Sequence, residues 1–249
     1  MKDTTMINPK NLCAAVLLTA VSGSAMAEIT GNLGVTNNYL WRGLTQSDNE
    51  SAISGGIDYA NDNGFYVGTW ASNVNYGAMD SYSYEHDVYF GYGGEAGSIT
   101  YDVGYLYYNY DAINKFDFGE VYGSVSFGDA TLGAYILTNT EADDNGLNPD
   151  GSQQDFGAGG TYYIYGDYGF ELENGLGIGL HAGMHEGDFS YAFNGVPDSY
   201  VDYSISFEID GFSFTISDTD LDSEVVGDTL QNGDVKFAVA YTWDFGLGK

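Results

Sequence analysis

The chain has 249 residues, with 36 acidic side chains against 6 lysines and arginines, which gives a formal net charge of -30. A protein that binds a nucleic-acid duplex needs many basic side chains to displace its counterions. Because this chain has few of them, no nucleic-acid partner is expected. The single cysteine excludes a disulfide scaffold and a thiolate metal cluster, while 43% hydrophobic and 16% aromatic residues are too many for a disordered acidic tail.

Residues 1–27 have the pattern of a secretory signal peptide. Two lysines precede an apolar run from Leu12 to Val21, and Ala25-Met26-Ala27 matches the small-x-small cleavage rule. The run is about half the roughly 20 residues that a membrane-spanning helix needs, and no later segment approaches that length. We therefore expect cleavage after Ala27 and an exported chain of residues 28–249 that forms one domain.

Beyond residue 28 the dominant hydrophobic period is two, which in a strand sends successive side chains to opposite faces. In 98–108, for example, Ile99, Val103 and Tyr105 share one face, with Asp102 and Gly104 on the other. Segments of this kind predict twelve strands, near 29–40, 51–60, 65–74, 83–92, 98–108, 117–127, 130–139, 156–172, 176–185, 200–209, 212–218 and 234–245.

The connections between these strands alternate in length. The even-numbered ones are short and rich in glycine and asparagine, at 61–64, 93–97, 128–129, 173–175 and 210–211, whereas the odd-numbered ones are longer and acidic. We therefore predict an all-β fold, a transmembrane antiparallel β-barrel of about twelve strands with short periplasmic turns and long acidic extracellular loops. A soluble sandwich is the alternative, but it would have to protect the edges of a very aromatic sheet.

Aromatic residues gather toward the predicted strand ends. Amphipathic rings form girdles at the lipid headgroups of outer-membrane barrels. We assign to these girdles Tyr39, Trp41, Tyr59, Tyr92, Tyr107, Tyr203, Tyr241, Trp243 and Phe245.

Three stretches carry a resemblance to a known family: 38–46 (NYLWRGLTQ), 55–59 (GGIDY) and 64–73 (GFYVGTWASN). With the Asp210-Gly211 turn and the acidic stretch at 217–220, they resemble the TorF-like family of bacterial outer-membrane porins, long described only as conserved proteins of unknown function. The resemblance implies an outer-membrane barrel with a porin role, and it supplies no catalytic residues. One departure is that 246–249 follow Phe245, where many outer-membrane strands end on an aromatic residue.

Catalytic and metal motifs are weak. His181 and His185 would share a zinc ion on a helix, but in a strand they are about 13 Å apart. Adjacent His86 and Asp87 point to opposite faces of a strand and cannot act as an acid–base couple. The stretch that begins at Asp218 resembles a calcium loop but lacks its glycine and its final glutamate. We expect no cofactor, no metal and no enzymatic activity.

If the apolar faces meet lipid, the opposite faces line the lumen. Acids outnumber bases there by eight to two, which favours cations in a narrow aqueous bore. For Arg42, the only arginine of the mature chain, an internal salt bridge is the favoured role. The predicted pore-lining residues with charge are Arg42, Asp58, Asp87, Asp102, Glu120, Asp202, Glu208, Asp234, Lys236 and Asp244.

These patterns together predict an outer-membrane porin that gives passive, cation-preferring diffusion of small solutes. Its expected partners are outer-membrane lipid, lipopolysaccharide and small solutes, including cations. The alternatives are a non-conducting structural or surface-interaction barrel and an outer-membrane barrel enzyme.

Overall fold

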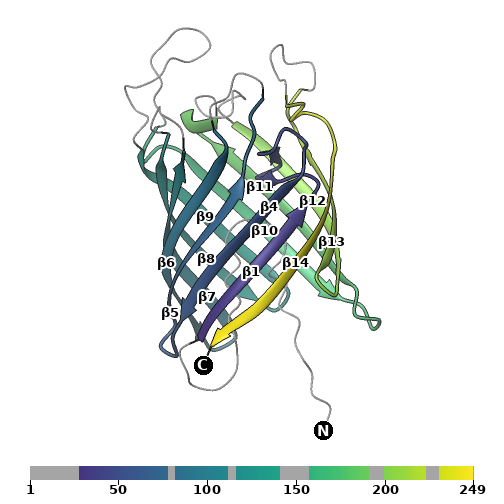
Figure 1. The fold of residues 1–249 in the computed structure, drawn as a ribbon. Helices are drawn as coiled ribbons and strands as arrows, with labels where there is room; N and C mark the ends of the chain where they lie inside the picture. Colours follow the sequence, from purple (N-terminus) through teal and green to yellow (C-terminus); the bar gives the residue numbers. More distant parts are fainter. Residues whose placement is uncertain are drawn as a thin grey trace.

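The computed structural model describes residues 28–77, 82–111, 116–140, 157–190, 199–222 and 230–248. Twelve antiparallel strands form a closed barrel in which each strand pairs with its neighbours along the chain, and β1 pairs with β14 to close the ring (Figure 1). The strands are β1 (Glu28–Thr36), β4 (Ala52–Ala60), β5 (Phe65–Asn73), β6 (Tyr84–Ala96), β7 (Ile99–Tyr110), β8 (Phe118–Phe127), β9 (Ala130–Thr140), β10 (Tyr162–Glu171), β11 (Gly177–Glu186), β12 (Ser199–Ile209), β13 (Phe212–Thr219) and β14 (Lys236–Gly248).

Closure satisfies the backbone of the first and last strands. Leu33 of β1 lies opposite Trp243 of β14 on one side and Gly55 of β4 on the other. The sheet therefore has no free edge, and the predicted twelve-stranded barrel is confirmed. No helix in the described ranges is long and apolar enough to cross a membrane.

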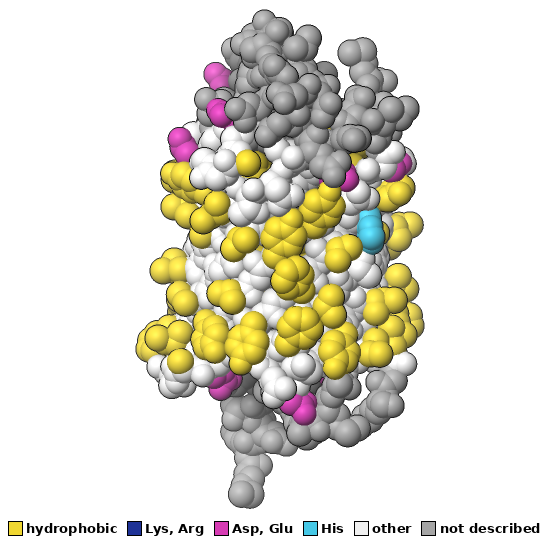
Figure 2. Space-filling view, turned by 90° about the vertical axis from the view of Figure 1, so that its left-hand side faces the viewer, with side chains coloured by type: hydrophobic (Ala, Val, Ile, Leu, Met, Phe, Trp, Pro, Cys, Tyr) yellow, Lys and Arg dark blue, Asp and Glu magenta, His cyan; other side chains and the backbone are white. Residues whose placement is uncertain are grey.

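The outer wall is apolar. Ile53 is 68% exposed, Leu132 66% and Trp243 57%, and these residues alternate along their strands with inward polar ones. Figure 2 shows apolar side chains spread over the height of the wall, with acidic ones near its two ends. Such a continuous apolar surface is unfavourable in water and suits contact with hydrocarbon.

Short connections join the strands at one end of the barrel, which we call the turn end, and the opposite end is the loop end. Gly64, Gly128 and Gly175 have positive φ at the predicted turns. One turn differs from the prediction: β6 runs to Ala96, so only Gly97 and Ser98 connect it to β7. Residues 93–96 belong to the strand because they continue the ladder with 99–102 of β7.

The interior divides into two sides by side-chain size. On the packed side, β5 to β9 bury large residues that form one cluster, including Tyr66, Tyr89, Tyr108 and Phe118. On the open side, β12, β13, β14, β1 and β4 carry small inward residues such as Ser204, Thr215 and Ala240. The lumen is therefore filled on one side and hollow on the other.

The first long connection folds into the barrel instead of extending outward. The predicted strand at 29–40 ends at Thr36, and residues 37–47 enter the lumen as a small hairpin of β2 (Leu40–Trp41) and β3 (Leu44–Thr45). The assignment of Tyr39 and Trp41 to the lipid girdles is therefore wrong, since they are only 4% and 6% exposed and pack in the interior cluster. By contrast, Tyr92, Tyr203 and Trp243 are exposed on the outer wall as expected.

The structure shortens one predicted strand, and other predicted features lie outside the residues that it describes. The strand predicted at 156–172 is β10, which begins only at Tyr162 because 157–160 form a turn. The signal peptide at 1–27 and about half of the loop acids, including Asp80, Asp144 and Asp198, lie outside the described residues.

The outward placement of alternate residues is testable at Val121, in the middle of β8. This side chain is 46% exposed and lies between Tyr105 and Ile136 of the neighbouring strands. Val121→Lys should lower the free energy of unfolding in phospholipid vesicles by about 2–4 kcal/mol, because an ammonium would face hydrocarbon. Val121→Leu is the matched control. An unchanged urea midpoint for Val121→Lys would contradict this placement.

Candidate functional site in the barrel lumen

A cavity of about 410 Å³ lies on the open side of the lumen. It extends from the inward hairpin toward the turn end, where Asp210 and Gly211 border it. A third of its lining residues have small hydroxyl or amide side chains. Lining residues with hydroxyl or amide side chains are Thr30, Asn32, Thr36, Asn38, Ser54, Ser72, Ser204, Ser213, Thr215, Ser217 and Thr242.

The inward hairpin, residues 37–47, crosses the lumen as a bar. Its turn residues Arg42 and Gly43 have φ of 49° and 78°, the two positive values of a type I′ turn, in which glycine is favoured. A Cβ on Gly43 would lie 2.6 Å from Cβ of Asp202, so a larger residue could not seat the tip against β12. Tyr200 of β12 also donates its hydroxyl to the Arg42 carbonyl at 3.0 Å.

The Arg42 side chain reaches from this tip to the packed side. Its Nη2 lies 2.7 Å from Oε2 of Glu120 on β8, and both side chains are almost fully buried. The guanidinium also lies over the rings of Trp41 and Tyr163, 4.1 and 4.5 Å from their centroids. The predicted internal salt bridge of Arg42 is therefore confirmed, and buried charges need this kind of pairing.

Other contacts tie the hairpin to different walls. Tyr39 donates its hydroxyl to Glu85 of β6 at 2.8 Å. Burial, followed by the charge of Glu85, raises the pKa of the Tyr39 hydroxyl well above its ordinary value, so this group remains a donor. Near the loop end, Thr45 N–H donates to the Asn232 side chain at 3.0 Å. The bar is thus held on several sides of the barrel.

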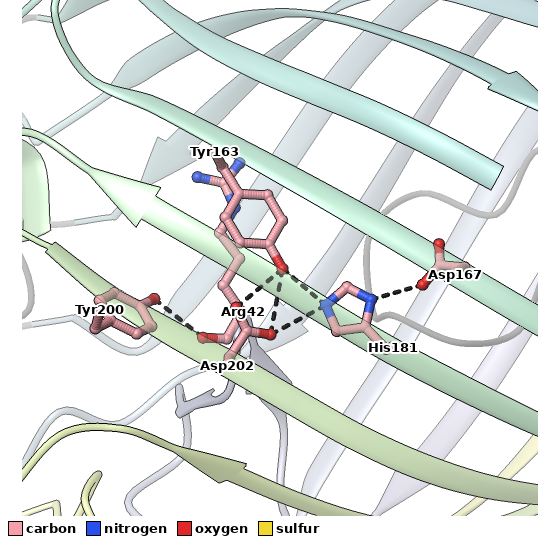
Figure 3. Close-up of polar contacts among 6 residues, drawn as sticks. All are labelled: Arg42, Tyr163, Asp167, His181, Tyr200 and Asp202. Carbon is pink, nitrogen blue, oxygen red and sulfur yellow. Dashed lines mark hydrogen bonds and ion pairs between the residues drawn. The ribbon is translucent and has the colours of Figure 1, made fainter.

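A histidine network lies beside the tip of the hairpin (Figure 3). Nδ1 of His181 is 2.6 Å from Asp167, and Nε2 is 3.0 Å from Asp202. Tyr163 donates its hydroxyl to Asp202 at 3.0 Å. Nε2 of His181 also lies 2.8 Å from the Tyr163 hydroxyl, so carboxylates and a phenol contact the two ring nitrogens.

Tyrosine hydroxyls orient several of the inward carboxylates. Tyr66 donates to Asp102 at 2.7 Å, and Tyr110 donates to Glu85 at 2.6 Å. The abundance of tyrosine thus has an internal cause that the girdle prediction did not include.

The predicted pore-lining residues fall into three groups. Arg42, Asp58, Asp202, Glu208 and Asp244 line the cavity. A second group is buried on the packed side and consists of Asp87, Asp102 and Glu120, with Asp102 less buried than the others. The third group lies near the loop end: Lys236 is buried and donates to Asn49 at 2.7 Å, and Asp234 is exposed in a bend before β14.

Sequence reasoning missed the aromatic residues of the site, in particular Trp70, Tyr89 and Tyr163. A signal that could have identified inward tyrosines is a glycine on the neighbouring strand. The Tyr163 ring covers Gly183 on β11, and the Tyr66 ring covers Gly91 on β6. An inward tyrosine can fold over a glycine of the adjacent strand, whereas a lipid-facing one need not.

The weaker motifs have structural roles in the described part of the chain. Asp220 accepts the Val201 N–H at 2.7 Å, and Asp218 accepts the Tyr203 hydroxyl at 3.1 Å, so both acids brace β12 against β13. His185 packs against the Trp41 ring with centroids 5.8 Å apart. Among the described residues, no three His, Cys, Asp or Glu side chains group as a metal site would require.

Three solved structures of similar fold are described as porins. The KdgM porin matches with a TM-score of 0.51 and 7% identity, covering 88% of this chain and 99% of that one. The KdgM porin in complex with disordered oligogalacturonate gives a TM-score of 0.50 and 10% identity, with 88% and 99% covered. The NanC porin gives a TM-score of 0.51 and 12% identity, with 86% and 97% covered. At these identities the likeness establishes the fold alone.

Among curated protein sequences none matches this chain. A family profile described as a bacterial protein of unknown function (Gcw_chp) matches residues 20–249. Since this match spans nearly the whole sequence, the chain belongs to the Gcw_chp family of bacterial proteins.

Proposed function

We propose that this protein is an outer-membrane porin through which small solutes diffuse passively, with a preference for cations. The observation that carries the proposal is the charge of the cavity. Five acidic residues line it, while its arginine, Arg42, is paired with Glu120. Uncompensated carboxylates in a narrow aqueous passage concentrate cations and repel anions.

The outer-membrane location rests on two features. The apolar outer wall suits hydrocarbon, and the pattern of residues 1–27 indicates export with cleavage after Ala27. In this placement the turn end faces the periplasm and the loop end faces outward, where the acidic loops contact lipopolysaccharide. The resemblance to the TorF-like porins agrees with this assignment.

The structurally similar porins also suggest transport rather than catalysis. One of them is described in complex with oligogalacturonate, a polymer of sugar acids. The cavity of the present barrel is lined by acidic side chains, and these would repel such a polyanion. We therefore propose small cationic and neutral solutes instead of acidic oligosaccharides.

The direct test is the reversal potential of single channels in a planar bilayer under a KCl gradient. The mature chain should conduct and should favour K⁺ over Cl⁻. The double variant Asp244→Asn, Glu208→Gln should lower this preference, because it removes two charges from the cavity wall. Asp62→Asn, in the turn between β4 and β5, is the control and should leave the preference unchanged. A folded but silent barrel would support the structural or enzymatic alternatives.

The hairpin gives a second test of transport, because it obstructs part of the lumen. Glu120→Gln leaves the buried Arg42 charge without its carboxylate, which should lower the free energy of unfolding by about 3 kcal/mol. We expect the loosened bar to give a larger and noisier single-channel conductance than the native chain. Glu95→Gln, at the exposed end of β6, changes the charge equally and should match the native conductance. Native conductance in a folded Glu120→Gln barrel would show that the hairpin does not limit the passage.

A further inference from the structure

We infer that the cavity wall formed by β14, β1, β4 and β5 is a binding site for small organic ammonium ions. This inference rests on the proposed porin function and names the class of solute that the passage would favour. The site combines two carboxylates, an amide and an indole ring on one continuous surface.

The strand register places three of these groups in one row. Asn32 of β1 lies opposite Asp244 of β14, and on its other side opposite Gly56 of β4, which in turn lies opposite Trp70 of β5. Directly opposed residues point to the same face of a sheet. The Asp244 carboxylate, the Asn32 amide and the Trp70 indole therefore follow one another along the wall, and all three line the cavity.

A second carboxylate lies two residues along β4 from Gly56. Asp58 also lines the cavity, and Tyr89 of β6 donates its hydroxyl to Oδ1 of this carboxylate. Tyr89 is 2% exposed, so a buried phenol fixes the position of the acid. Asp58 and Asp244 thus face the same space from the two strands that flank β1.

Gly56 allows the Asn32 amide and the Trp70 indole to lie close to the backbone of β4. A Cβ at this position would lie 2.8 Å from the Thr69 carbonyl oxygen, 3.1 Å from Nδ2 of Asn32 and 3.3 Å from Cδ1 of Trp70. The Trp70 ring is itself held by Tyr39 of the hairpin, with centroids 5.5 Å apart and planes at 65°. The wall is therefore a preformed cradle with a fixed aromatic side.

The chemistry of this cradle matches an ammonium ion with an apolar body. Carboxylates bind the charge, and an indole ring attracts both a cation and the carbon atoms attached to it. An inorganic cation would use oxygen ligands only, and an anion would be repelled. A neutral sugar could stack on Trp70, but it would gain little from two carboxylates. The nearby Arg42 does not neutralise them, because it is paired with Glu120.

The experiment measures block of the K⁺ current of the mature chain by choline, with glucose and gluconate as neutral and anionic probes of similar size. Choline should block in a concentration-dependent manner, and glucose and gluconate should not. Asp58→Asn and Asp244→Asn should each raise the half-blocking concentration by about tenfold, which corresponds to about 1.4 kcal/mol. Asp62→Asn should leave it unchanged.

Two further variants separate the cradle from general electrostatics. Trp70→Leu and Gly56→Ala should weaken the choline block while the preference for K⁺ over Cl⁻ stays at its native value. Equal block by glucose, stronger block by gluconate, or choline block that none of these variants alters would overturn the inference. Absence of any K⁺ current would instead overturn the proposed porin function, so the two failures are distinguishable.

Discussion

The Arg42 guanidinium lies deep inside the barrel with Glu120 2.7 Å away, and the rest of the lumen is arranged around this buried pair. A single arginine in an acidic interior needs a carboxylate partner and can then hold a chain segment in place. Here the segment is the hairpin of β2 and β3, whose tip rests on Asp202 and whose backbone accepts a hydrogen bond from Tyr200. The pair therefore decides how much of the lumen is filled.

The two sides of the lumen then take different roles. On the packed side, aromatic rings cover the buried carboxylates, and phenols donate to them, as Tyr110 does to Glu85. On the open side, serine, threonine and alanine leave room for a cavity. Side chains fill the interior of small barrels, whereas large barrels enclose an aqueous channel, and a barrel of twelve strands lies between the two. The size of the inward side chains on each strand therefore sets the free cross-section of the lumen.

Much of the fold follows from the sequence because strand periodicity is a local property. The alternation in 98–108 predicts β7 and the outward position of Val103, and the glycine-rich turns mark one end of the barrel. The inward course of residues 37–47 could not be predicted, because it depends on Glu120 and Tyr200, which are distant in sequence. The errors at Tyr39 and Trp41 have this one cause.

The site was predictable in its charges and not in its shape. The role of Arg42 follows from its being the only arginine of the mature chain in an acidic interior. Trp70 was missed because the strand at 65–74 alternates weakly, so its inward face is not evident from the residues alone. The cradle at Gly56 requires the register of β1, β4 and β5, which only the folded barrel supplies.

Cysteine labelling of the cavity wall shows whether the acidic passage is open to charged solutes. The mature chain has no cysteine, since Cys13 lies in the predicted signal peptide, so Thr242→Cys would introduce a single thiol into the cavity wall. A cationic methanethiosulfonate reagent should react with it faster than an anionic one of similar size, after each rate is normalised to that of Ser98→Cys in the β6–β7 turn. Equal normalised rates would mean that the passage does not select for cations, and no reaction at Thr242→Cys in a folded barrel would mean that the cavity is closed to solutes.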